Sequence, residues 1–188
     1  RPFPFPVRRG PLAKLATLRR PYSYMFSPEL KRDLARELAR GFDVLHLEQL
    51  FTGWLGLAHP SRTLLSVHYL PSIDLEADGR PSDIKGRRDR WLALRAERTL
   101  LRRLRHFRAG SPRLVPRILA TNPAAHVEVV PLGLDVSLYP YVPDARRTGE
   151  PVVSLIGNMD WAPTRSAAIR LVTRLWPQIK RRVPAARL

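Results

Sequence analysis

The sequence HVEVVPLGLDVSLYPYVPD (residues 126–144), followed after a polar break by PVVSLIGNMDWAPTRSAAIRLVTRLWPQIKRRVPAARL (residues 151–188), decides the fold of this chain. Its two short apolar runs, at 126–130 and 151–157, predict strands, and the amphipathic stretch over 164–183 predicts a helix. A Pro/Gly turn and a linker separate the two runs. This order is typical of a place where one α/β domain ends and another begins.

Upstream of this stretch, apolar runs alternate with helical patterns. The sequence predicts further strands at 42–50, 63–70 and 106–111, and helices at 28–40, 52–60, 86–105 and 111–119. We interpret residues 1–27 and 71–86 as irregular, because Pro, Gly and charged residues interrupt them. The strand patterns are nearly continuous rather than alternating, which favours parallel strands covered on both faces. We therefore expect an α/β fold with a Rossmann-like parallel sheet and flanking helices.

The helix predicted over 86–105 is strongly amphipathic. At 100° per residue its apolar side chains gather on one side: Leu92, Ala93, Ala96, Leu100, Leu101 and Leu104. Four arginines gather on the other side: Arg88, Arg95, Arg98 and Arg102. Glu97 falls within the apolar sector, so we expect an Arg partner for it or a position at a domain edge.

The composition excludes several classes of protein. There is no Cys, so disulfides, thiolate metal sites and a Cys nucleophile are excluded. No apolar run approaches the roughly 20 residues that span a bilayer, and the first residues lack a signal-peptide pattern, so we expect a cytoplasmic protein. The sequence has no Gly-x-Gly-x-x-Gly, Walker or Gly-x-Ser-x-Gly motif and no Asp-x-Asp, and its five His are scattered. We expect neither a metal nor a cofactor.

The net charge of +17 is concentrated in one part of the chain. Residues 85–117 contain 12 Arg or Lys and 2 acidic residues, a net charge of +10. This segment can be a solvated surface, a site for phosphate or anionic lipid at the inner face of a membrane, or a nucleic-acid surface. Its basic residues are not regularly interleaved with aromatic ones, and it has no RNA-binding signature, so we expect no nucleic acid partner. A non-enzymatic basic protein that binds nucleic acid or anionic membrane through 85–117 is nevertheless the alternative function.

Two turns carry a resemblance to a known family. PLGLD (131–135), followed by LYP (138–140), and IGNMDWAPT (156–164) resemble the hinge and the first donor-side strand and turn of family 4 glycosyltransferases, which are retaining enzymes of the GT-B fold. WPQIKRRVPAARL (176–188) is similar to the helix that follows in that family. The chain departs from the family pattern at Leu132, where relatives have Asn, and at Pro163-Thr164 and Ser166.

The resemblance assigns residues to the hinge and to the donor site. Gly133 and Asp135 belong to the hinge, where we expect Gly133 to supply the positive φ of the turn. Gly157, Asn158, Met159 and Asp160 would bind the donor. A Gly just after a parallel strand lets a diphosphate approach backbone N–H groups, and the following helix offers its N-terminal dipole.

Two polar residues are the candidates on the acceptor side. His68 follows one predicted buried strand and Glu48 lies near the end of another. The carboxyl ends of parallel strands share one edge of the sheet, where open α/β sheets bind ligands. Imidazole titrates near neutral pH and can orient a hydroxyl, although a lone His at a strand end can equally be structural. By resemblance we take His68, and less strongly Glu48, as catalytic candidates.

The resemblance implies a partial two-domain enzyme. Residues 1–135 would form the acceptor-side domain, 136–150 the linker and 151–188 the first βα unit of the nucleotide-sugar domain, with both domains incomplete. The implied reaction moves a hexose from a nucleotide-diphosphate sugar to a glycan or lipid-linked acceptor, with retention and without a metal. This activity is typical of bacterial cell-surface polysaccharide biosynthesis, and a peripheral contact with anionic membrane would suit a lipid-linked acceptor.

Two features of the family are not found in this sequence. Relatives carry a Gly-rich acceptor loop nearer their N-terminus and a pair of Glu seven residues apart on the donor side. We therefore expect the 188-residue chain alone to be inactive as a transferase and to fold marginally.

Overall fold

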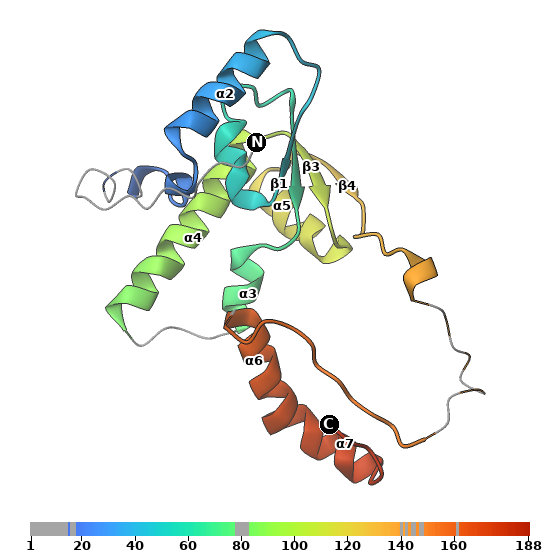
Figure 1. Ribbon diagram of the computed structural model, residues 1–188. Coiled ribbons are helices and arrows are strands. Elements are labelled where there is room, and N and C mark those ends of the chain that lie inside the picture. Colours follow the sequence, from blue (N-terminus) through green and yellow to red (C-terminus); the bar gives the residue numbers. More distant parts are fainter. Residues whose placement is uncertain are drawn as a thin grey trace. The chain divides into compact units, whose positions relative to one another are not determined.

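The computed structural model of the chain describes residues 15, 18–77, 83–139, 141, 143, 146, 149–160 and 162–188 (Figure 1). The chain divides into two compact units, Arg1–Leu132 (unit 1) and Gly133–Leu188 (unit 2). Each unit is described by itself below. The domain limits 135 and 150 that the sequence predicts remain predictions.

Unit 1 is built on a parallel sheet of four strands. The strands are β1 (Leu45–Glu48), β2 (Thr63–Val67), β3 (His106–Ala109) and β4 (His126–Val129), in the order β1-β2-β3-β4. In the register, Leu47 lies beside Leu65, which lies beside Phe107. The α/β fold with a parallel sheet is therefore confirmed, and each strand is shorter than its apolar run in the sequence. Figure 1 shows helices packed around this sheet.

The helices of unit 1 connect and cover these strands. They are η1 (Ser23–Met25), α2 (Pro28–Ala39), η2 (Leu50–Leu55), α3 (Pro71–Ala77), α4 (Ile84–Arg103), η3 (Pro112–Leu114) and α5 (Val115–Thr121). Helix α2 begins where the sequence predicts, because the Ser27 hydroxyl accepts a hydrogen bond from the Leu30 amide at 3.1 Å. It ends before Gly41, whose φ of 97° favours glycine.

The prediction that residues 71–86 are irregular is wrong for 71–77, which form α3, and for 84–86, which begin α4. A buried carboxylate explains this helix, because Glu97 of α4 accepts a hydrogen bond from the Ser72 amide at 2.8 Å. That bond satisfies one of the amides that a helix leaves unpaired at its N-terminus. Glu97 thus lies in the apolar sector as predicted, but its hydrogen-bond partner is a backbone amide on another helix rather than an Arg. Residues 78–82 lie outside the described part of the chain.

The core of unit 1 lies between the sheet and α4. Leu65, Leu100, Leu104, Phe107 and Ile118 are each at most 1% exposed and belong to one cluster. All six apolar residues predicted to face the core from α4 are buried. Burial of this kind stabilises the fold by roughly 1.5–3 kcal/mol for each large apolar side chain. Helix α4 therefore contributes strongly to the stability of unit 1.

Unit 2 contains a short turn and a long helix. Its elements are η4 (Val136–Leu138), α6 (Ala162–Arg170), the π-helical turn η6 (Leu171–Leu175) and α7 (Trp176–Arg182). The helix predicted over 164–183 is confirmed, with one π turn. Pro177 lies at the start of α7 and cannot donate a backbone hydrogen bond, and the Gln178 side chain donates to the Arg174 carbonyl at 3.0 Å.

The strand predicted over 151–157 is wrong. This segment makes a single parallel bridge, between Val152 and Arg187, closed by Val153 N–H to Arg187 O and Arg187 N–H to Pro151 O, both at 2.8 Å. Ile156, at the end of the run, is 96% exposed. An apolar run becomes a strand only where a partner runs alongside it, and here the described residues pair at one position.

Candidate functional site

The candidate site lies at the carboxyl edge of the sheet of unit 1. Glu48 is the last residue of β1, and in the register it lies beside Ser66 of β2, which lies beside Arg108 of β3. His68 follows β2, and Gly110 follows β3 and donates its amide to Val67 O at 2.9 Å. The five residues line a cavity of about 50 Å³. The parallel register thus brings the two predicted acceptor-side residues to one place.

Glu48 contacts two imidazoles with its two carboxylate oxygens. His68 Nε2 lies 2.6 Å from Oε2, and His46 Nε2 lies 3.1 Å from Oε1. His46 Nε2 also lies 2.8 Å from Ser66 Oγ. The hydrogen bond from His68 is the main cause that holds the pKa of Glu48 below its ordinary value, with smaller contributions from Ser66 and His46. Glu48 is therefore ionised at neutral pH.

The ionised carboxylate fixes the proton position on the His68 ring. A carboxylate only accepts hydrogen bonds, so His68 carries a proton on Nε2, while His46 Nε2 lies within reach of both Ser66 Oγ and Glu48 Oε1. This arrangement is not that of a Ser-His-Glu hydrolase triad, where the acid and the Ser engage opposite nitrogens of one ring. Here the same nitrogen of His46 faces both Ser66 and Glu48. The cluster is suited to hold His68 in one orientation rather than to activate Ser66.

The backbone is strained next to Glu48. Gln49 has φ 71° and ψ 144°, a region that residues other than Gly rarely adopt. Its amide donates to Ser66 O at 2.9 Å, and the Thr52 hydroxyl contacts the carbonyls of Glu48 and Gln49, both at 2.8 Å. These bonds maintain the turn that leaves the side chain of Glu48 at the exposed edge.

Sequence reasoning missed His46, Ser66 and Gln49. The signal for His46 was present, because residues two apart on a strand share a face, and His46 precedes Glu48 by two. Ser66 lies opposite Glu48 only through the register of β1 with β2, which apolar runs do not specify. The strain at Gln49 has no sequence signal that we recognise.

The predicted donor residues form one turn of unit 2. The Asn158 side chain accepts a hydrogen bond from the Asp160 amide at 2.9 Å, which closes the turn. A Cβ on Gly157 would lie 2.7 Å from Thr164 Cγ2, so only glycine fits without a shift. Met159 is exposed. The turn precedes α6, which is the local arrangement that the sequence predicts.

The predicted hinge residues differ in outcome. The expectation of a positive φ at Gly133 is wrong, because Gly41 and Gly149 are the glycines with positive φ in the described part of the chain. Residues 131–135 run without a turn, so no left-handed residue is needed there. Asp135 caps η4, accepting from the amide and the hydroxyl of Ser137 at 2.9 and 2.7 Å. These two bonds lower the pKa of Asp135.

Metal ligands and membrane spans were also sought among the described residues. These residues contain no group of three or more His, Cys, Asp or Glu able to hold a metal ion. None of the described helices has the length and apolar character needed to cross a membrane.

The comparison with protein families covers unit 1 and the hinge. Residues 2–138 match the family model described as Glycosyltransferase Family 4, which is more than half of the chain. The matched span includes Glu48, His68, Gly133 and Asp135. No curated protein matches the chain.

Proposed function

Because this chain belongs to Glycosyltransferase Family 4, we propose that it serves the transfer of a hexose from a nucleotide-diphosphate sugar to a glycan or lipid-linked acceptor. The observation that carries the proposal is the 2.6 Å contact between His68 and Glu48 at the carboxyl edge of the parallel sheet. Open α/β sheets bind their ligands at this edge. The proposed pathway is bacterial cell-surface polysaccharide synthesis.

The proposed chemistry assigns positioning to His68. Its Nε2 proton is held by Glu48, so its Nδ1 is left to orient a hydroxyl of the bound sugars when the ring is neutral. The bond from the anomeric carbon to the diphosphate breaks as the acceptor oxygen bonds to that carbon, and the acceptor proton leaves with the diphosphate. We propose that the product retains the anomeric configuration and that no metal takes part.

The proposed donor contacts come from unit 2. The Gly157–Asp160 turn precedes the nine-residue helix α6, whose first amides lack intrahelical acceptors. A diphosphate is an acceptor that such amides bind. A Cβ on Gly157 would lie 2.7 Å from Thr164 Cγ2, so a larger residue there would disturb the turn that precedes these amides.

A peripheral contact with the inner face of an anionic membrane is part of the proposal. Helix α4 carries the predicted arginines, and Trp91 is 48% exposed with the Arg95 guanidinium 5.0 Å from its ring centre. Ile84 at the start of α4 is also exposed. Exposed apolar and basic groups on one helix suit a surface that holds a lipid-linked acceptor.

The function is tested by transfer of labelled hexose from UDP-glucose and GDP-mannose to a polyprenyl-linked acceptor, using the protein encoded by the complete reading frame. Replacing Glu48 with Gln removes the charge that holds the His68 proton, so we expect the rate to fall about 10²-fold or more. The control is Glu37→Gln on α2, whose carboxylate pairs with Arg40 at the surface.

Two results would contradict the proposal. The first is an equal transfer rate for Glu48→Gln and Glu37→Gln, which would show that the candidate site takes no part in the reaction. The second is no transfer from any nucleotide sugar together with tight binding to duplex DNA that weakens steeply as the salt concentration rises. That result would favour the alternative of a non-enzymatic basic protein.

A further inference from the structure

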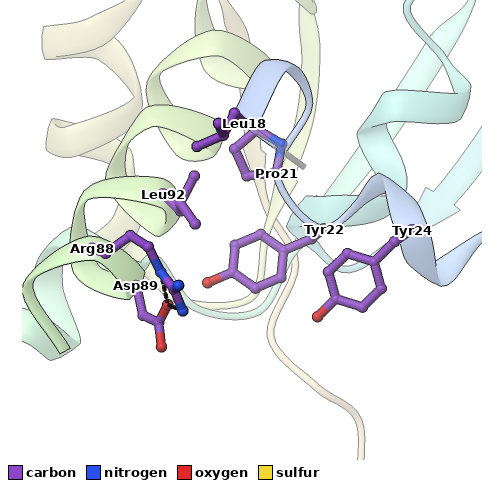
Figure 2. A pocket seen from close by; sticks show the side chains of 7 residues that line it. All are labelled: Leu18, Pro21, Tyr22, Tyr24, Arg88, Asp89 and Leu92. Carbon is purple, nitrogen blue, oxygen red and sulfur yellow. Dashed lines mark hydrogen bonds and ion pairs between the residues drawn. The ribbon is translucent and has the colours of Figure 1, made fainter. Parts of the chain in front are cut away.

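Unit 1 has a second and larger cavity, of about 610 Å³, which the candidate site does not use. It lies between the segment around η1 and the N-terminal half of α4 (Figure 2). Its apolar surface comes from Leu18, Pro21 and Leu92. Pockets that hold small molecules span roughly 300–1,000 Å³, so this cavity has the size of a ligand site.

The polar wall of the cavity is made of two phenols and an ion pair. Tyr22 and Tyr24 have ring centres 6.4 Å apart, and Arg88 and Asp89 lie across from them. Figure 2 shows the Tyr22 hydroxyl pointing toward Arg88 and Asp89, and the Tyr24 hydroxyl pointing the same way. Ring faces, hydroxyls and planar charged groups therefore line one hollow.

This wall is fixed in place before any ligand binds. Tyr22 has φ 68°, and its ring stacks on Phe51 with centres 4.0 Å apart. The neighbouring Pro21 carbonyl accepts a hydrogen bond from the buried Trp54 indole at 2.7 Å. A side chain held in an uncommon backbone conformation by such contacts costs little further entropy on binding.

The charges of the described residues that line the cavity cancel. Arg88 Nε and Nη2 both donate to Asp89 Oδ1, at 3.1 and 2.9 Å. Burial, followed by the neighbouring Tyr24 and Asp89, raises the pKa of Tyr22, so its phenol stays protonated at neutral pH. The wall thus offers hydroxyl donors and acceptors without net charge, and Asp89 would repel a phosphate.

We propose that this cavity binds a neutral pyranose unit of the acceptor. A pyranose has apolar C–H faces, which pack on tyrosine rings, and a rim of hydroxyls, which pair with phenols, a carboxylate and a guanidinium. The inference rests on the proposed function, because it takes the sugar to belong to the acceptor. It favours a glycan acceptor over one recognised by its phosphate.

Tyr69, which directly follows His68, is one of the groups that raise the pKa of Tyr22. In the proposed complex the terminal sugar of the glycan meets His68, and the chain extends toward Tyr22 and Tyr24. The cavity would hold a sugar that does not react, and binding energy from such units raises the rate at the reacting centre.

The test is direct binding to the 188-residue chain, measured by NMR with labelled tyrosine rings. The probes are the methyl glycosides of glucose, mannose and galactose, with glucose 1-phosphate as the charged comparison. We expect at least one neutral glycoside to shift the Tyr22 and Tyr24 signals in a saturable way. Tyr24→Phe, which removes one hydroxyl and keeps the ring, should weaken that binding roughly three- to tenfold.

Two further variants sharpen the test. Arg88→Gln should also weaken binding, whereas Tyr139→Phe, at an exposed tyrosine of unit 2, should leave it unchanged. Shifts by glucose 1-phosphate with none by the neutral glycosides would overturn the proposal, as would saturable binding that Tyr24→Phe and Arg88→Gln both leave intact. The absence of any shift with all probes would overturn it as well.

Binding of UDP, measured beside the glycosides, distinguishes a failure of this inference from a failure of the proposed function. Binding of UDP at Gly157–Asp160 without any sugar at Tyr22 and Tyr24 would leave the transferase proposal standing and remove the pocket assignment. Sugar binding at the tyrosines, in a complete protein that transfers no hexose, would do the reverse.

Discussion

The two units of this chain bury similar apolar sequences to very different extents. In unit 1, Phe107 lies on β3, which has β2 on one side and β4 on the other, and it is 1% exposed. In unit 2, Ile156 ends an apolar run just before Gly157, yet it is 96% exposed. Ala186 is the one buried residue of unit 2 among those that the structure describes.

The difference shows which part of a fold a local pattern specifies. An apolar run indicates that a segment can be buried, but neighbouring strands and a covering helix determine whether it is buried. In unit 1, β3 has neighbouring strands on both sides and is covered by α4. In the described part of unit 2, the run 151–157 pairs with one residue, Arg187.

The largest expected effect compares the two apolar residues directly. Phe107→Ala opens a cavity in the core of unit 1 and should lower the free energy of unfolding by about 3–5 kcal/mol. Ile156→Ala removes an exposed side chain and should change it by less than about 0.5 kcal/mol. Urea unfolding followed by circular dichroism measures both. A large loss of unfolding free energy for Ile156→Ala would show that unit 2 buries this residue in solution. The two units would then not differ as described.

A smaller effect concerns two glycines that each face a threonine. A Cβ on Gly56 would lie 2.4 Å from Thr63 Cγ2, and one on Gly157 would lie 2.7 Å from Thr164 Cγ2. Thr63 cannot rotate away, because it is buried and its hydroxyl contacts Gly56 O and His59 O at 3.1 and 2.8 Å. We expect Gly56→Ala to cost about 1–3 kcal/mol, as overpacked cores do.

Gly157→Ala should cost less than Gly56→Ala, because Thr164 is only half-buried and can adjust. The measurement is the urea midpoint of the two variants under one set of conditions. An equal or greater cost at Gly157 would mean that the turn in unit 2 is as rigidly packed as the core of unit 1. It would strengthen the case that this turn is built for a ligand.

Sequence reasoning succeeded where the information is local. The N-cap Ser27 and the apolar stripe of α4 follow from spacing along one helix, and both are confirmed. It failed where distant residues decide, since α3 depends on Glu97 from another helix and the 151–157 run depends on its pairing. A positive φ at Gly133 was inferred from a motif, but the backbone there does not turn.

The candidate site was predictable to the same degree. Alternation along β1 and the shared edge of parallel strands brought Glu48 and His68 to one place, as the sequence indicated. The arrangement of His46 and Ser66 around the same carboxylate depends on the register between β1 and β2. One residue of slip would turn Glu48 to the other face, so the site is as well defined as the packing that fixes the register.

The smallest expected effect is on how the free energy of unfolding depends on pH. It also distinguishes unit 1 from unit 2. Burial is the main cause that raises the pKa of Glu97 above 4.5, its ordinary value; Ser72 and Arg117 oppose the shift, and Asp74 adds to it. The stability that neutral Glu97 gives unit 1 is therefore complete below about pH 4.5 and is lost as pH rises through the raised pKa. Glu97→Gln stays neutral and keeps an acceptor for the Ser72 amide. Relative to the wild type, it should gain stability as pH rises through that window, measured as the urea midpoint at several pH values.

The matched control is Glu150→Gln in unit 2, whose carboxylate is exposed and lies 3.7 Å from Arg187. An exposed pair of this kind contributes little, so its difference from the wild type should stay flat over the same pH range. A flat difference for Glu97→Gln as well would mean that Glu97 reaches water in solution. The capping bond to Ser72 would then be weaker than its 2.8 Å length indicates, and α3 would depend on Leu70 and its other buried neighbours instead.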